Sequence, residues 1–142
     1  MRLAEMLVPA NPQAGNLYTP HTDALVAFFR LGGSIEDNVG RWAASMTNAA
    51  GKPVTPTIVV KEIAGLKVHD VQMNGTYLDG MPGGERTSRE AWGFRAAIIE
   101  TGLPLTFIRM TGPQSLMEAH ADEWTQMLES MNARKMMPEG HP

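Results

Sequence analysis

The chain contains no cysteine. Disulfides, thiolate zinc sites and a cysteine nucleophile are therefore excluded. It also has no excess of basic residues, since 12 Lys and Arg stand against 15 Asp and Glu, for a formal charge of −3. That balance argues against non-specific binding of nucleic acid, which requires a basic surface. No apolar run reaches the roughly 18 residues of a membrane-spanning helix.

The first ten residues also lack the basic region and apolar run of a signal peptide. We expect a cytoplasmic protein if Met1 is the native start and an exported one if a leader has been removed. Apolar residues make up 43% and charged residues 19% of the 142 residues, a composition typical of a globular protein. We predict a single domain over residues 1–132 and a flexible tail over residues 133–142, where apolar periodicity is lost.

The most ordered pattern is the segment GGSIEDNVGRW at residues 32–42. The two glycines allow a sharp exit from a strand, and Ser34 is a typical helix N-cap. We predict a helix from Ser34 to about Asn48, ended by Gly51 as C-cap. Its polar face would carry Glu36, Asp37, Asn38, Arg41 and Ser45, and its apolar face Ile35, Val39, Trp42, Ala43 and Met46.

Most of the remaining chain has the composition of strands. Alternation or β-branched runs predict strands at residues 2–8, 24–30, 55–63, 66–78, 91–100 and 103–110. Short turns at 64–65 and 101–102 predict hairpins. Residues 79–90 have the glycine and charge content of a long polar loop, and residues 9–20 that of a proline-rich loop.

A second helix is predicted after Thr111-Gly112, with Pro113 at its first position. An apolar stripe follows at spacings of three and four: Leu116, Met117, His120, Trp124, Met127, Leu128 and Met131. The element order is then β-β-α-β-β-β-β-α. We predict an α+β fold with a mostly antiparallel sheet of about six strands, covered by two helices.

Four short motifs together resemble those of the bacterial PsbP-like group, at residues 32–42, 75–77, 81–84 and 111–113. That group is related in fold to the photosystem protein PsbP and to the Ran-binding protein Mog. The resemblance covers about residues 2–131. It implies a PsbP/Mog-like α+β fold and, by resemblance to PsbP itself, a structural subunit of a larger membrane-associated complex.

No cluster of residues in the sequence indicates catalysis or a metal. The four histidines at 21, 69, 120 and 141 lack paired spacing, and no nucleophile elbow or phosphate-binding loop is present. Ser34 is better explained as a cap than as a nucleophile. We predict no catalytic residues, no metal and no cofactor.

We therefore predict a non-catalytic binding or complex-assembly module. The alternatives are a small-ligand-binding protein or small enzyme with a pocket between sheet and helices, or a subunit of a membrane-associated complex. A protein partner would dock on the 78–90 loop or on the acidic face of the last helix, which carries Glu118, Asp122, Glu123 and Glu129. The candidate binding residues are Tyr77, Met81, Arg86, Arg89, Trp92 and Arg95.

Overall fold

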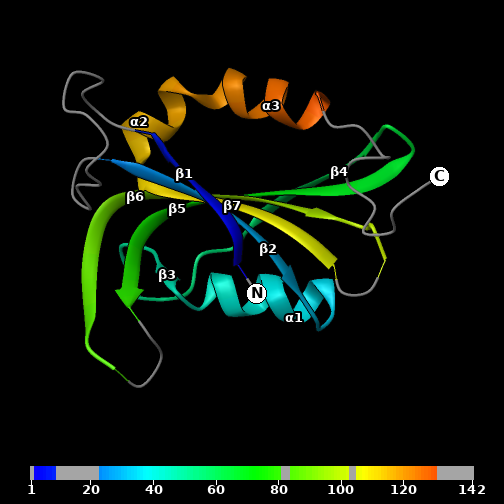
Figure 1. Ribbon diagram of the computed structural model, residues 1–142. Coiled ribbons are helices and arrows are strands. Elements are labelled where there is room, and N and C mark those ends of the chain that lie inside the picture. The colour runs from blue at the N-terminus through cyan, green and yellow to red at the C-terminus, as the bar shows by residue number, and fades with distance from the viewer. Residues whose placement is uncertain (1, 9–22, 81–83, 103–104, 131–142) are drawn as a thin grey trace.

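The computed structural model describes residues 2–8, 23–80, 84–102 and 105–130. It is an α+β fold, as predicted, in which an antiparallel sheet lies between α1 on one face and α2 and α3 on the other (Figure 1). The elements are β1 (Arg2–Val8), β2 (Ala24–Leu31), α1 (Ile35–Ala43), β3 (Met46–Thr47), β4 (Thr57–Ile63), β5 (Leu66–Gly80), β6 (Arg86–Ile99), β7 (Leu105–Pro113), α2 (Gln114–Ala119) and α3 (Ala121–Glu129).

The sheet has the strand order β1-β2-β7-β6-β5-β3, and β4 pairs with the first half of β5. All strand pairs are antiparallel. The six predicted strands are therefore present, and β1 lies at an edge. The β4–β5 turn has positive φ at both Ala64 and Gly65, as a two-residue hairpin turn requires.

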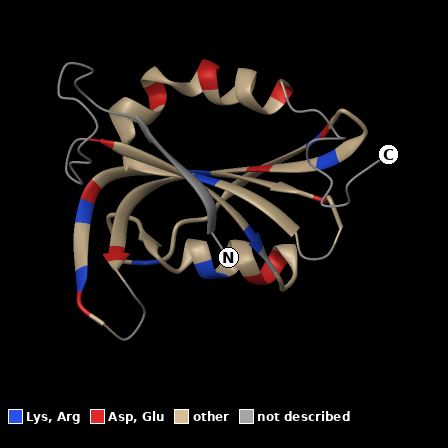
Figure 2. Ribbon diagram, viewed as in Figure 1, with Lys and Arg blue, Asp and Glu red and all other residues tan. Residues whose placement is uncertain are grey.

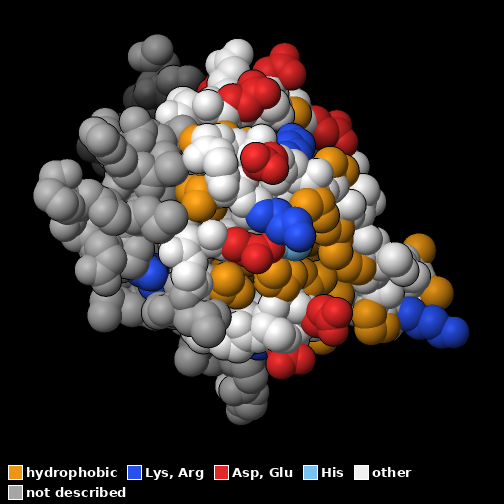
Figure 3. Space-filling model, turned by 90° about the vertical axis from the view of Figure 1, so that its right-hand side faces the viewer, with side chains coloured by type: hydrophobic (Ala, Val, Ile, Leu, Met, Phe, Trp, Pro, Cys, Tyr) orange, Lys and Arg blue, Asp and Glu red, His pale blue; other side chains and the backbone are white. Residues whose placement is uncertain are grey.

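β4 pairs with β5 alone among the described strands. Its side chains Ile58, Val59 and Val60 are 44%, 50% and 53% exposed. Figure 3 views the molecule from this side, where hydrophobic side chains gather at the surface. Across the described residues, every helix is too short or too polar to cross a membrane.

Helix α1 begins as predicted but ends earlier. The Ser34 side chain accepts a hydrogen bond from the Asp37 amide at 3.0 Å, which confirms its role as N-cap. The predicted continuation to Asn48 is wrong, because Met46 and Thr47 leave the helix and pair with Tyr77 and Thr76 of β5. The predicted C-cap Gly51 lies instead in a turn, where the Gly51 amide donates a hydrogen bond to the Asn48 carbonyl.

The predicted long loop at residues 79–90 is also wrong. β5 continues to Gly80 and β6 starts at Arg86, with these two residues paired. Polar side chains are compatible with strand here because this end of the hairpin is largely exposed to water. Gly80 permits the close approach, since it has φ +138° and a Cβ there would collide with the Glu85 carbonyl.

The predicted last helix is divided in two at His120. α2 and α3 meet there, and His120 has φ −109° and ψ 15°. Pro113 occupies the N-cap of α2 rather than its first helical position. Most of the predicted apolar stripe nevertheless faces the sheet, where Leu116, Met117 and Met127 pack around the buried Trp124 and Leu128. Met131 lies outside the described residues.

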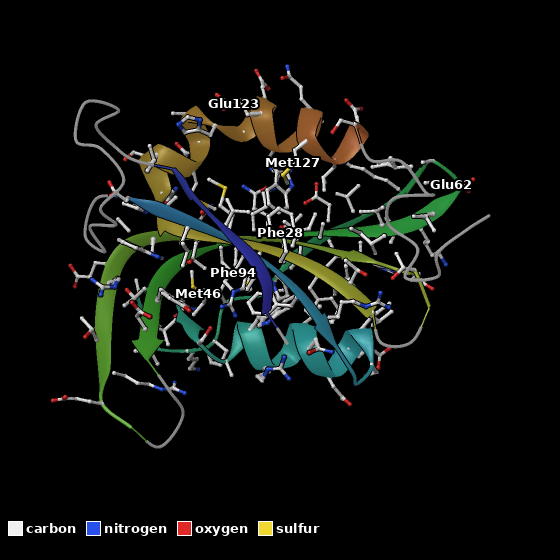
Figure 4. The ribbon with its side chains drawn as sticks, in the orientation of Figure 1. Phe28, Met46, Glu62, Phe94, Glu123 and Met127 are labelled. Atoms are coloured by element: carbon white, nitrogen blue, oxygen red, sulfur yellow. The ribbon has the colours of Figure 1, made fainter. Side chains whose placement is uncertain are left out.

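Two hydrophobic cores lie on the two faces of the sheet. The first, under α2 and α3, contains Val26, Val68, Ile99 and Trp124, and the second, against α1, contains Trp42, Met46, Phe94 and Phe107. Figure 4 shows Phe28 and Met127 on the first side and Met46 and Phe94 on the second. Because successive strand residues face opposite sides, β6 and β7 contribute to both cores.

Candidate anion-binding site

A cavity of about 390 Å³ lies between the end of α1, the last residues of β5 and the first residue of β6. These parts of the two strands curve past the layer of α1 (Figure 1). The volume of the cavity falls in the range of small-molecule sites. Three arginines from three different elements line it, so we call it the arginine pocket: Arg41 of α1, Arg86 of β6 and Arg109 of β7.

Arg41 is held by the start of its own helix. It lies in the last turn of α1 and donates to the side-chain oxygen of Asn38. The Asn38 amide nitrogen donates in turn to the carbonyls of Ser34 at 2.8 Å and Gly32 at 3.3 Å. Asn38 was predicted on the polar face but is only 1% exposed. The difference arises because its amide satisfies backbone carbonyls at the strand exit, where Gly33 has φ +91°.

Arg109 comes from the middle of an otherwise apolar strand. The pleat of β7 alternates Arg109 with Ile108 and Met110, which belong to the core under α2 and α3, so Arg109 lies on the α1 face. Its guanidinium lies over the ring of Phe29, 4.9 Å from the centroid. Such cation–π contact holds the charged group at a fixed place above the sheet.

Tyr77 is the half-buried polar group among these arginines. Burial raises the pKa of its phenol above the ordinary value of 10.0, although the charges of Arg109, Arg86 and Arg89 oppose that effect. Desolvation disfavours the phenolate more than the arginines favour it. At neutral pH Tyr77 is therefore a hydroxyl that can donate a hydrogen bond into the pocket.

The acidic side chain Asp79 in the pocket wall is already paired. Its carboxylate accepts from Arg89 Nε at 2.8 Å. Arg86 makes no ion pair with any acidic residue in the described ranges. Arg41 and Arg86 therefore leave positive charge at the described part of the pocket, and this charge can favour an anion.

Aromatic side chains form the inner wall. Trp42 packs against Phe94 with ring centroids 5.4 Å apart, and both belong to the core against α1. Ser45, the serine of the lining, donates a hydrogen bond to the Trp42 carbonyl at 2.6 Å. The described lining residues include no histidine, and their carboxylate, Asp79, is paired with Arg89.

The structure separates the six candidate residues predicted from the sequence. Tyr77 and Arg86 line the arginine pocket, and Arg89 pairs with Asp79 at its rim while lying over the buried ring of Trp92. Met81 lies outside the described residues. Arg95 is on the opposite face of the sheet.

Arg95 belongs to a buried ionic cluster under α3. It contacts both carboxylate oxygens of Asp70, at 3.2 and 2.9 Å. The same carboxylate accepts from Lys61 at 3.3 Å and from the indole of Trp124 at 3.2 Å. With its acceptor oxygens engaged, Asp70 fastens α3 to the sheet, and we assign this cluster a structural role.

Sequence reasoning missed Arg41 and Arg109 as site residues. The sequence signal for Arg109 is its position as a lone arginine within the run LTFIRM. Burying a charge in an apolar strand costs free energy unless the charge has a partner, so such a residue is a candidate for a site. For Arg41, the helical spacing predicts only a place on the polar face of its helix.

Two of the four histidines, His69 and His120, lie in the described residues, and each is near one glutamate. His69 bonds Glu100 at 2.6 Å, and His120 Nδ1 lies 2.9 Å from Glu123 without the alignment of a hydrogen bond. Among the described residues, no group of three or more His, Asp or Glu side chains is arranged to hold a metal ion.

The sequence matches no protein-family model and no curated protein. The fold is similar to the crystal structure of a protein of unknown function from Pseudomonas aeruginosa, described as a putative regulator. The TM-score is 0.52 with 16% identity, and the alignment covers 90% of this chain and 80% of that one. At this identity the likeness supports the fold alone.

Proposed function

We propose that the protein is a non-catalytic binding module that takes a small anionic molecule in the arginine pocket. The observation that carries the proposal is the meeting of Arg41, Arg86 and Arg109 around one cavity, in whose described lining the acidic residue, Asp79, is paired with Arg89. Arginine is suited to this task because its planar fork matches the oxygens of carboxylates and phosphates. A binding role is also what the sequence predicts, because it supplies no nucleophile, base and oxyanion donor together.

The test is an NMR titration of the full chain with sulfate, compared with chloride at equal ionic strength to remove general screening. We expect the amide signals of Ser45, Leu78 and Gly80 to shift with sulfate and to stop shifting at saturation. Arg109→Gln should weaken this response, whereas Lys67→Gln, an equal loss of charge at an exposed site on β5, should leave it unchanged. Shifts that are absent, or equally spread over the surface, would overturn the proposal.

The acidic face of α2 and α3 is a second candidate, as a surface for a basic protein partner. Glu118, Asp122, Glu123 and Glu129 are all exposed, and neither helix carries a lysine or arginine (Figure 2). A lysine-rich peptide should shift amide signals of these helices, and the double variant Glu118→Gln/Glu123→Gln should lose that response. Equal shifts near acidic residues elsewhere would contradict a specific surface.

A further inference from the structure

The arginine pocket offers more hydrogen-bond donors than one carboxylate can accept. Each guanidinium has five N–H donors, and Tyr77 adds a hydroxyl. Arg41 directs one donor to Asn38, and Arg86 pairs with no acidic residue of the described ranges, so the count is made on these two arginines and Tyr77. A carboxylate has two oxygens and one charge, whereas a phosphomonoester has three terminal oxygens and a charge of about −1.5 to −2 at neutral pH. The donor set therefore matches the phosphate better.

The cavity is also too large for a phosphate group alone. Its volume of about 390 Å³ is that of a site for a whole small organic molecule. Beside the arginines its wall includes the half-buried side chains of Tyr77 and Leu78. A flat ring would fit this part, because aromatic rings pack well against one another and against arginine side chains.

We infer that the arginine pocket takes a phosphomonoester of a small molecule that carries a flat ring, an inference that rests on the proposed binding function. The phosphate lies among Arg41, Arg86 and Arg109, and the ring lies against Tyr77 and Leu78. Inorganic phosphate, which shares the charge, and aromatic carboxylates, which share the ring, are the ligands that the test must separate.

The experiment is isothermal titration calorimetry of the full chain with phenyl phosphate, inorganic phosphate and benzoate, at about pH 7.5 where the phosphates are mostly dianions. We expect phenyl phosphate to bind at least about tenfold more tightly than either of the others, a difference of about 1.4 kcal/mol. If benzoate bound as tightly as phenyl phosphate, the assignment of a phosphate group would be overturned. If inorganic phosphate bound as tightly as phenyl phosphate, the assignment of a ring to the ligand would be overturned.

Variants locate the binding. Arg109→Gln should weaken phenyl phosphate at least about tenfold, the loss expected for a charge-assisted contact. Because Arg109 also packs on Phe29, the exposed Arg86→Gln is the second variant, and it should weaken binding without lowering the melting temperature. Lys67→Gln is the matched control and should bind as the native chain does. Unchanged affinity in Arg86→Gln and Arg109→Gln would place the ligand elsewhere and overturn the inference.

The sulfate titration separates this inference from the proposed function. Sulfate shifts at the pocket, together with no preference for phenyl phosphate, would overturn the ring-bearing phosphomonoester and leave anion binding intact. The absence of pocket shifts with every anion would overturn both. Preference for phenyl phosphate, with shifts at Ser45, Leu78 and Gly80, would support both.

Discussion

Ser34 contributes to stability through one side-chain hydrogen bond at the start of α1. Its oxygen accepts from the Asp37 amide at 3.0 Å, and that amide would otherwise lack a partner within the helix. Ser34→Ala should lower the free energy of unfolding by about 0.5–2 kcal/mol, whereas Ser34→Asp should be nearly neutral. Urea unfolding followed by circular dichroism measures both. An equal loss in the two variants would show that the cap is not the cause.

Tyr77 makes stability depend on alkaline pH. Its pKa is raised by burial in the folded state, so its contribution is complete below the unfolded value of 10.0 and is lost as pH rises through the folded pKa. We expect the native chain to lose stability more steeply above pH 10 than Tyr77→Phe, in which this group cannot ionise. The difference between the two unfolding curves as a function of pH measures the effect. Parallel pH profiles would show that the phenol is not desolvated.

At the scale of elements, α3 is fastened to the sheet through Trp124. The indole is 3% exposed and donates to Asp70, a carboxylate that also binds Arg95 and Lys61. Trp124→Phe keeps most of the apolar contact and removes a hydrogen bond to a charged group, worth about 1.5–3 kcal/mol. We expect the amides of α3 to exchange with solvent faster, by a larger factor than those of β6. Amide hydrogen exchange by NMR is the measurement.

Asp70→Asn changes the other partner of the Trp124 hydrogen bond, on β5. It keeps a side-chain oxygen for Trp124 but leaves Arg95 without its counter-charge. Breaking a fully buried pair costs about 3–5 kcal/mol, and Arg95 keeps some exposure, so we expect a loss near 3 kcal/mol. This variant should lower the free energy of global unfolding and not only that of α3, because Asp70 and Arg95 lie on β5 and β6 within the sheet. Stability equal to that of the native chain would contradict the structural role of the cluster.

At the scale of the whole molecule, the sheet is shared by two cores. Alternate residues of β6 face opposite sides, with Ala97 and Ile99 under α3 and Phe94 and Ile98 against α1. Neither layer can separate from the sheet without exposing a large part of its apolar surface to water. This arrangement favours cooperative unfolding of both layers together.

Tryptophan fluorescence tests this cooperativity, because Trp42 reports the α1 layer and Trp124 the α3 layer. Two variants each keep one reporter, with Phe replacing Trp92 and the other tryptophan. In each, the fluorescence and circular dichroism midpoints in urea should coincide. A fluorescence midpoint below the circular dichroism midpoint in either variant would show that its layer unfolds first.

Local patterns in the sequence were enough to predict most of the elements. The strands follow from alternation and β-branched runs, the start of α1 from Ser34, and the buried faces of the helices from the spacing of residues such as Trp42 and Trp124. These features depend on neighbours within a few positions along the chain, so the sequence contains their causes. The α+β class follows from the order of those elements.

Only the tertiary structure decided where α1 ends and where the pocket lies. Met46 leaves the helix because β5 offers a hydrogen-bonding partner. Residues 79–80 and 86–90 are strand because these two polar segments pair with each other. The arginine pocket joins Arg41, Arg86 and Arg109 from separate elements, which only the folding of the sheet brings together. Pairing across the sheet is non-local, and no pattern within a single segment specifies it.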